Sequence, residues 1–272
     1  FLGAGHIARP VIQIPFPDSD PFILLMDDML DKQDDIPVGG PHPHAGFETV
    51  SLILEGELGE GPHAMKAGDL EIMTAGSGII HTETIAKKMK MRLLQLWLNL
   101  PREKRQALPR IQRLKSDHVP QRTIGNNTIR VYSGTFANLT SPIQNHTPMI
   151  LADLNMKPDA SLGGMIPANF STFIYVLDGS VRVGAQGKLI SQNEVGWLDR
   201  YNEGGDSELM LTAADAGARL ILYSAEPQKH EIVSHGPFIA DSMDNIKQLY
   251  ADFRQGRMGH ISEVPPEQKF SY

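Results

Sequence analysis

Short apolar stretches separated by glycine and proline run along the whole chain. The 272 residues include 25 Gly and 19 Pro, which fall between stretches rich in valine, isoleucine and leucine. Examples of such stretches are residues 22–25, 49–54, 92–98 and 173–177. Closely spaced turn residues of this kind are typical of strands in a sandwich or barrel, whereas a parallel sheet would need helical segments between its strands. We therefore predict an all-β fold.

Two segments of the chain share one pattern. One begins at Phe47 and reads FETVSLILEGE, and the other begins at Phe170 and reads FSTFIYVLDGSV. Each runs from phenylalanine through an apolar stretch to an acidic residue and glycine. Each is then followed by a second turn, Gly68-Asp69 in one case and Asn193-Glu194 in the other. The repeat distance is about the size of one domain, which indicates an internal duplication.

The duplication divides the chain into a first domain at residues 1–135 and a second at 136–272. Between the repeats, residues 100–120 mix proline with basic residues, and we interpret them as a connector.

Residues 242–253 form the clearest helical pattern. Ser242 can cap the helix, and Gly256 can end it. Four apolar or aromatic residues recur at three- and four-residue spacing, so they lie on one face: Ile246, Leu249, Tyr250 and Phe253. We expect this face to pack against a barrel.

Composition limits the class of protein. The hydrophobic fraction of 41% and charged fraction of 21% are typical of a soluble globular protein. The formal charge of −7 gives no basic field, so we expect no direct nucleic-acid partner. No apolar run approaches the ~20 residues that cross a bilayer, and the start at Phe1 lacks a signal-peptide pattern, so we expect a cytoplasmic protein without membrane contact. Because cysteine is absent, imidazole and carboxylate groups must hold any metal.

Histidine and glutamate gather in two segments, GGPHPHAGFE at residues 39–48 and MTAGSGIIHTE at residues 73–83. Alternate residues of a strand share a face, so His42 and His44 point the same way, as do His81 and Glu83. Adjacent strands of a barrel can direct all four side chains into one cavity. A single His-x-His arises by chance, but the additional Gly-x-x-His-x-Glu favours a metal site. Such a ligand set suits Fe(II), Mn(II), Ni(II), Cu(II) or Zn(II) and does not identify the metal.

The remaining candidates lie near or outside this constellation. Glu48 is an even number of residues after His44, so in a strand without a bulge it would face the same cavity. We predict that it supports a metal ligand, and the alternative is a hydrogen-bonded structural carboxylate. Seven histidines have no second histidine at a useful spacing and are expected outside the site: His6, His63, His118, His146, His230, His235 and His260.

The histidine segments belong to a longer series of motifs. HPHAGFETV, LEGEL, GDLEIMTAGSGIIHTE and LLQLWLNLP follow one another, with DPFILLMDD upstream and GPFI and GRMG downstream. This series resembles the pirin family and covers nearly the whole chain. The resemblance implies a bicupin, meaning two antiparallel β-barrel or jelly-roll cupin domains, with a short C-terminal helix. It also implies one Fe(II) ion in the N-terminal cupin, on His42, His44, His81 and Glu83, and a C-terminal cupin without metal ligands. Residues 166–171, IPANFS, contain no histidine.

Two features depart from the family pattern. Arginine usually follows the second histidine, and here that residue is Ala45. Strand parity directs Ala45 away from the metal, so we expect the change to affect the rim or a surface contact. The hairpin at residues 57–66 is also shorter than is usual. Both features bear on substrate specificity.

Similarity to pirins with quercetinase activity implies a dioxygenase that opens the central ring of a flavonol such as quercetin with O₂ and releases carbon monoxide. Glu83 is then the expected catalytic base. The competing hypothesis, which follows from other pirins, is an iron-binding regulatory module that acts through a protein partner without turnover. Oxygen consumption with a flavonol would distinguish the two. Sugar-phosphate isomerisation is less favoured, because no basic cluster lies near the ligands to bind phosphate.

Overall fold

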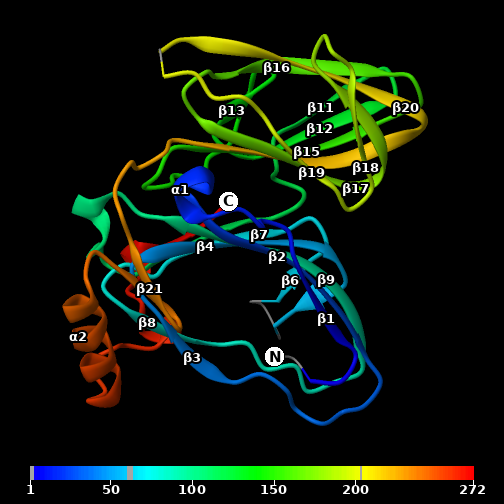
Figure 1. The fold of residues 1–272 in the computed structure, drawn as a ribbon. Helices are drawn as coiled ribbons and strands as arrows, with labels where there is room; N and C mark the ends of the chain where they lie inside the picture. The colour runs from blue at the N-terminus through cyan, green and yellow to red at the C-terminus, as the bar shows by residue number, and fades with distance from the viewer. Residues whose placement is uncertain (1–2, 60–63, 203) are drawn as a thin grey trace. The chain divides into compact units, whose positions relative to one another are not determined.

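The computed structural model describes residues 3–59, 64–202 and 204–272, which form two compact units (Figure 1). The first unit consists of residues 1–117 together with 228–272, and the second consists of residues 118–227. Strands dominate both, and α2 (Met243–Arg254) is the longest helix. The predicted all-β fold with a short C-terminal helix is therefore confirmed. Among the described residues, no helix has the length and apolar character of a membrane span.

The first unit is built around a seven-stranded sheet in the order β1-β2-β9-β4-β7-β10-β23. Neighbouring strands are antiparallel except for the parallel pair β10 and β23. The strands are β1 His6–Pro10, β2 Phe22–Lys32, β4 Phe47–Glu55, β7 Leu70–Thr74, β9 Met89–Asn99, β10 Arg110–Leu114 and β23 Lys269–Ser271.

Three two-stranded sheets and several short helices complete the first unit. The paired strands are β3 Pro41–His44 with β8 Ile79–Thr82, β5 Glu57–Leu58 with β6 Met65–Lys66, and β21 Val233–His235 with β22 Phe238–Ala240. The short helices are α1 Phe16–Ser19, η2 Arg102–Lys104, η3 Ile261–Glu263 and η4 Pro266–Gln268. Figure 1 shows β3 and β8 across the barrel from β4 and β7.

The second unit is a barrel built on the strand order β11-β12-β15-β20-β17-β18, in which β16 also pairs with β20 and β19 with β17. Strands β13 and β14, which come between β12 and β15 in the sequence, form a separate two-stranded sheet. The strands are β11 Gln121–Ile124, β12 Asn127–Ser133, β13 Thr135–Phe136, β14 Leu139–Thr140, β15 Met149–Met156, β16 Ser161–Pro167, β17 Ser171–Val183, β18 Lys188–Ser191, β19 Val195–Trp197 and β20 Asp206–Ala225.

The internal duplication is visible in the backbone hydrogen bonds of the two units. In the first unit the amide of Ile53 donates to the carbonyl of Asp69 over 3.1 Å, and in the second the amide of Val176 donates to the carbonyl of Glu194 over 3.2 Å. In both turns the acidic side chain also accepts a backbone N–H from the residue three positions earlier, over 3.0 Å and 2.7 Å. The two similar sequence segments thus fold into the same hairpin.

The C-terminal segment belongs to the first unit, whereas we predicted a second domain that spans all of residues 136–272. Residues 228–272 return to the first barrel, where β23 adds to the main sheet beside β10. Because β10 is itself a hydrogen-bonded strand of that sheet, the interpretation of residues 100–120 as a plain connector is wrong. The sequence pattern missed this strand because two prolines and several basic residues surround it.

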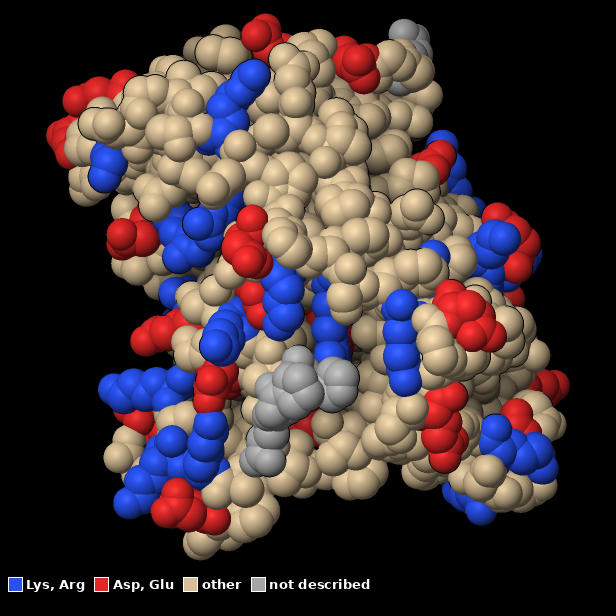
Figure 2. Space-filling view, turned by 180° about the vertical axis from the view of Figure 1, so that it is seen from behind, with Lys and Arg blue, Asp and Glu red and all other residues tan. Residues whose placement is uncertain are grey.

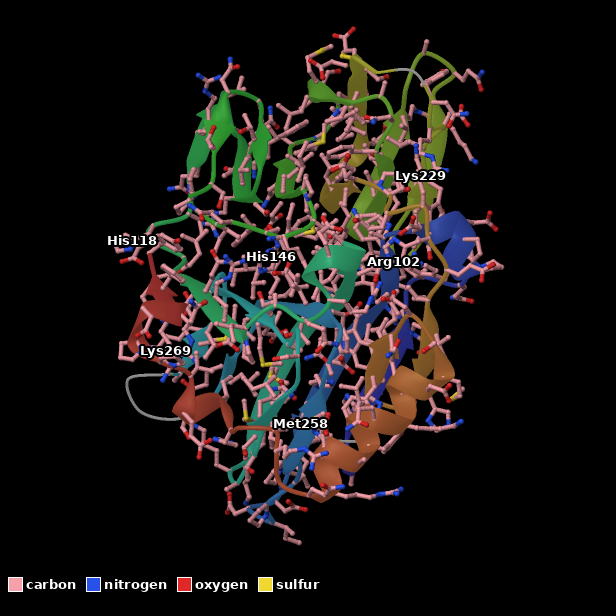
Figure 3. The ribbon with its side chains drawn as sticks, turned by 90° about the vertical axis from the view of Figure 1, so that its left-hand side faces the viewer. Arg102, His118, His146, Lys229, Met258 and Lys269 are labelled. Carbon is pink, nitrogen blue, oxygen red and sulfur yellow. The ribbon has the colours of Figure 1, made fainter. Side chains whose placement is uncertain are left out.

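Helix α2 forms as predicted. The hydroxyl of Ser242 accepts the amide of Asn245 over 3.2 Å and so caps the helix. Ile246 and Leu249 are buried, and the other predicted face residues pack beside them. This face lies against Phe238 and other apolar residues of the returning segment, including Met258, which is labelled in Figure 3. The helix therefore packs within the first unit.

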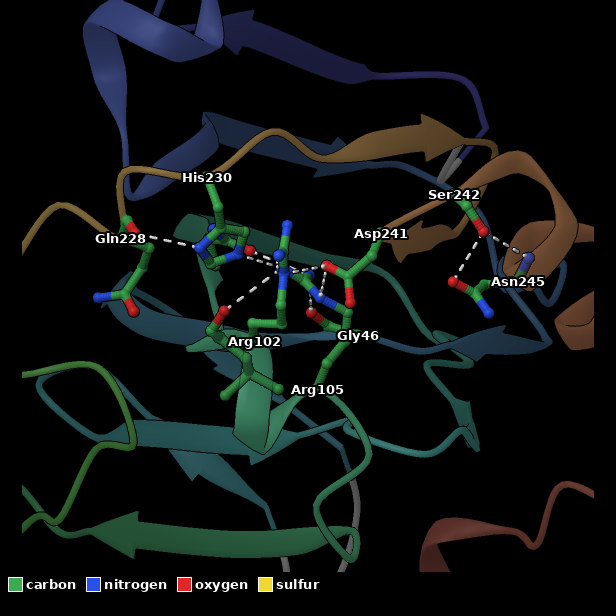
Figure 4. A network of polar contacts seen from close by, with 10 residues as sticks. Gly46, Arg102, Arg105, Gln228, His230, Asp241, Ser242 and Asn245 are labelled. Atoms are coloured by element: carbon green, nitrogen blue, oxygen red, sulfur yellow. Dashed lines mark hydrogen bonds and ion pairs between the residues drawn. The ribbon is translucent and has the colours of Figure 1, made fainter.

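Arg105 joins the returning segment to the first barrel (Figure 4). Its side chain is buried, and it donates to the carbonyl of Gly46 over 3.0 Å and to Asn99 Oδ1 over 3.1 Å. It also reaches His230 Nε2 at 2.7 Å and the carboxylate of Asp241 at 3.0 Å. The first two partners belong to the barrel and the last two to the returning segment. One buried cation thus satisfies polar groups from both.

Replacing Arg105 with methionine should lower the free energy of unfolding by ~3 kcal/mol, because a buried charge pair and several acceptors lose their partner. Limited proteolysis should then cut within residues 228–272. Arg102→Met is the matched control, because Arg102 approaches the same Asp241 at 3.7 Å but its side chain is 62% exposed. We expect a change below ~1 kcal/mol for that variant. Equal effects in a denaturant titration would contradict the role given to Arg105.

Candidate metal centre

Strands β3 and β8 bring three histidines together. His42 lies directly opposite His81 in this antiparallel pair, and His44 follows on the same side of β3. Nε2 of His81 lies 2.6 Å from Nε2 of His42 and 3.1 Å from Nε2 of His44. All three ligand atoms lie within 4.8 Å of one another, and His44 and His81 are buried. The alternation predicted for His42 and His44 therefore holds in β3.

The protonation of these imidazoles suits a metal ion. Nδ1 of His42 lies 2.9 Å from the carbonyl of Gly40, which places a proton on Nδ1 and leaves a lone pair on Nε2. Burial lowers the pKa of His44 to about 4 and that of His81 to about 2, and the neighbouring imidazoles add to both shifts. Neutral imidazoles that converge on one point leave lone pairs facing one another. A cation held among them would satisfy these lone pairs, so the residues fit a first-row metal.

Beside the histidines lies a cavity of about 610 Å³. The far wall carries alternate residues of β1, β2 and β9, which face the same side because they are cross-strand neighbours. These wall residues are His6, Ala8, Met26, Asp28, Leu93, Gln95 and Trp97. Trp97 stacks on Phe47 with 4.2 Å between ring centroids, and it meets His44 edge-on at 5.3 Å. The near wall holds residues 39–41 with His42, His44 and Glu83.

Glu83 borders the histidine cluster without joining it. It comes directly after β8 and lines the cavity, and its Oε1 lies 3.8 Å from Nδ1 of His81. It is not one of the groups whose ligand atoms lie within 4.8 Å of each other. Burial raises the pKa of Glu83, and repulsion from Glu71 and Asp28 acts in the same direction. The structure thus brings together three of the four predicted ligands, and coordination by Glu83 stays a prediction.

Glu48 is a hydrogen-bonded structural carboxylate, which was the alternative to a role in supporting a metal ligand. The chain turns at Gly46, whose φ is +87° and where a Cβ would lie 1.9 Å from the carbonyl oxygen of Ile239. Only glycine fits there, and the strand alternation that starts at His44 is interrupted. Glu48 is fully buried, accepts a hydrogen bond from Thr74 Oγ1 over 2.7 Å and lies 3.6 Å from Arg110. It does not line the cavity, so the expectation that it faces the metal is wrong.

His6 is a residue of the cavity wall. It was expected outside the site, but it lines the cavity, with its Nε2 2.8 Å from Oδ1 of Asp28. Histidine spacing could not reveal this, because the partner is a carboxylate on the neighbouring strand. Burial raises the pKa of Asp28, against the effect of the hydrogen bond from His6. Asp28, Gln95 and Trp97 were also missed, although a polar Gln95 within an apolar strand was an available signal.

Three other histidines have partners elsewhere in the first unit. His230 belongs to the Arg105 network, Nδ1 of His235 lies 3.2 Å from the hydroxyl of Tyr250, and Nε2 of His260 lies 3.0 Å from the hydroxyl of Thr82. His63 lies outside the described residues.

Ala45 lies in the core. It is fully buried in one apolar cluster with Phe238, Ile246 and Leu249, and its carbonyl accepts the amide of Ile239 over 3.0 Å. The expected effect of this residue on the rim or surface is therefore wrong, because the returning segment covers it. In the short hairpin, β5 and β6 pair with Glu57 opposite Lys66, and residues 60–63 at its tip lie outside the described residues.

Charged side chains are mixed on the face shown in Figure 2, where blue lysine and arginine alternate with red aspartate and glutamate. Over the described part of this face, no broad basic area of the kind that binds nucleic acid is visible.

The chain is similar to known proteins along most of its length. Residues 15–98 match the family model described as Pirin, and residues 151–259 match the Pirin C-terminal cupin domain. Pirin of Mus musculus is 34% identical over 265 residues, which cover 93% of this chain and 86% of that protein. A putative quercetin 2,3-dioxygenase of Pseudomonas aeruginosa is 33% identical over 271 residues, with 93% and 92% covered. The crystal structure of quercetin 2,3-dioxygenase from Acinetobacter baumannii has a TM-score of 0.82 at 24% identity, with 94% and 93% covered.

The converging histidines predict that the purified protein binds about one equivalent of a first-row metal per chain. His81→Ala should lose most of this metal, because His81 contacts both other imidazoles, while the fold persists on its apolar core. Metal analysis after dialysis, together with circular dichroism, would measure both effects. His118→Ala is the control, since His118, labelled in Figure 3, is exposed. Two bound equivalents, or full retention in His81→Ala, would contradict this site.

Proposed function

Because this chain belongs to the pirin family of bicupins, we propose that it is a metal-dependent dioxygenase of the quercetinase type, which opens the central ring of a flavonol with O₂. The observation that carries the proposal is the cavity of about 610 Å³ that is lined by His42 and His44, two of the three clustered histidines. Pockets of about 300–1,000 Å³ are typical of small-molecule sites. The name of the Pseudomonas aeruginosa relative supports the same chemistry.

The proposed ligands are His42, His44, His81 and Glu83, and the proposed metal is Fe(II). When bound, the metal would supply Lewis-acid polarisation of a substrate oxygen and electron exchange with O₂. The imidazoles are oriented for this task by their surroundings: the Gly40 carbonyl fixes the tautomer of His42, and Trp97 packs against the ring of His44. The site is thus preorganised by groups that do not themselves take part in the reaction.

Glu83 is the proposed base. Its carboxylate lines the cavity beside the histidines and accepts a hydrogen bond from Gln95, which orients it. From there it can take the hydroxyl proton of a flavonol, and a bound metal would stabilise the negative charge left on that oxygen. The opposite wall includes Trp97, whose ring is held by stacking on Phe47 and can pack against an aromatic ligand.

Glu83→Gln keeps the size of the side chain and one oxygen but removes the proton acceptor. We expect metal to be retained at least in part while flavonol-dependent oxygen uptake falls by ~10² or more. Oxygen-electrode rates normalised to bound metal would measure this. The control is Glu57→Gln, at a partly exposed residue outside the cavity.

Turnover near the wild-type rate in metal-loaded Glu83→Gln would overturn the role of Glu83. If the metal-loaded wild-type protein consumes no oxygen with any flavonol, the dioxygenase proposal fails. A regulatory module that acts through a protein partner would then be favoured.

A further inference from the structure

A histidine–aspartate pair stands on the cavity wall opposite the metal-binding histidines. Nε2 of His6 lies 2.8 Å from Oδ1 of Asp28, and both side chains are largely buried, 7% and 13% exposed. Both line the cavity that His42 and His44 also line. Neither residue belongs to the two histidine-containing segments at residues 39–48 and 73–83.

The sheet fixes this pair in place. His6 lies opposite Leu30 and Ala8 opposite Asp28 in the antiparallel pair of β1 and β2. Asp28 is in turn opposite Leu93 of β9. Residues that pair directly across strands share a face, so the same alternation that points Leu93 into the cavity also points Asp28 there.

The adjacent Asp27 is a purely structural carboxylate of the same strand. It faces the other side of the sheet, is fully buried, and receives two hydrogen bonds from Arg92, over 2.9 Å and 2.8 Å. Among the described residues no arginine pairs with Asp28, and its hydrogen-bond partner is His6. A carboxylate oriented by an imidazole on one side still has acceptor capacity toward the cavity.

The rest of the cavity lining limits what Asp28 can bind. No lysine or arginine is among the described residues that line it, and its two carboxylates are Asp28 and Glu83. An anionic group such as phosphate would be repelled there. The apolar wall residues Met26, Leu93 and Trp97 favour a flat apolar body. The lining therefore suits a neutral aromatic ligand that carries a hydrogen-bond donor.

We propose that Asp28, positioned by His6, accepts a hydrogen bond from a ligand hydroxyl group remote from the metal-binding end, and so selects polyhydroxylated aromatic ligands. This inference rests on the proposed function, because it takes the metal end of the ligand to be a flavonol's hydroxyl and ketone oxygens. Asp28 is a specificity-determining residue, and His6 is a positioning residue that acts through it.

Two flavonols separate this role from general damage to the cavity. Quercetin has hydroxyl groups on both outer rings, whereas 3-hydroxyflavone keeps only the metal-binding pair. Binding is measured under argon with Fe(II)-loaded protein, by quenching of Trp97 fluorescence in a Trp197→Phe background, since the chain has two tryptophans. We expect Asp28→Ala to weaken quercetin binding by ~10-fold or more, the scale for losing a hydrogen bond to a charged group, while 3-hydroxyflavone changes by less than about threefold.

Matched variants test the positioning role and the fold. Asp28→Asn retains an acceptor oxygen and should show an intermediate loss. His6→Ala should weaken quercetin selectively, and His6→Gln, which keeps a donor for Asp28, should recover part of that loss. Asp31→Ala, at the exposed end of the same strand, should behave as wild type. Bound metal and circular dichroism are recorded for every variant.

Equal losses for both flavonols in Asp28→Ala, or no binding of either flavonol by the wild type, would overturn this inference. The proposed function fails separately. Asp28-dependent binding of quercetin without oxygen uptake would support the inference and refute the dioxygenase. Oxygen uptake by the wild type together with unchanged quercetin selectivity in Asp28→Ala would support the dioxygenase and refute the role of Asp28.

Discussion

Three imidazoles whose Nε2 atoms converge on one point have to be held there by the rest of the protein. The immediate support is the pairing of β3 with β8, which sets His42 opposite His81. A two-stranded sheet is marginal by itself. Here the returning C-terminal segment supports both strands near the end formed by His44 and Ile79: the amide of Ile80 donates to the carbonyl of Gly259 over 2.9 Å, and Ala45, next to His44, pairs with Phe238. The histidine cluster thus depends on residues far away in the sequence.

This dependence explains which features could be predicted from the sequence. Alternation within one strand placed His42 with His44 correctly, because HPH lies in a single regular strand. It failed for Glu48, because the left-handed turn at Gly46 separates β3 from β4. The duplicated hairpins and helix α2 were predictable, since turn residues and apolar spacing are local signals.

The features that were missed are those made by pairing between distant segments. His6 reaches the cavity because β1 pairs with β2, and Ala45 is buried because residues 228–272 return to the first unit. Neither pairing leaves a periodic trace in the sequence. The division of the chain at residues 135 and 136 assumed that two repeats mean two continuous segments. A strand such as β23, which adds to the sheet of the other repeat's unit, breaks that assumption.

The charges in the cavity limit the class of ligand that it can bind. A divalent metal on neutral imidazoles would bring two positive charges, and Glu83 and Asp28 together bring two negative ones, so the cavity with its metal is close to neutral. A neutral ligand that passes its hydroxyl proton to Glu83 leaves this total unchanged, because the proton stays within the site. A phosphorylated ligand would add negative charge where no described lining residue is a lysine or arginine. The same electrostatic constraint that disfavours sugar-phosphate chemistry therefore favours acid–base exchange with a neutral phenol.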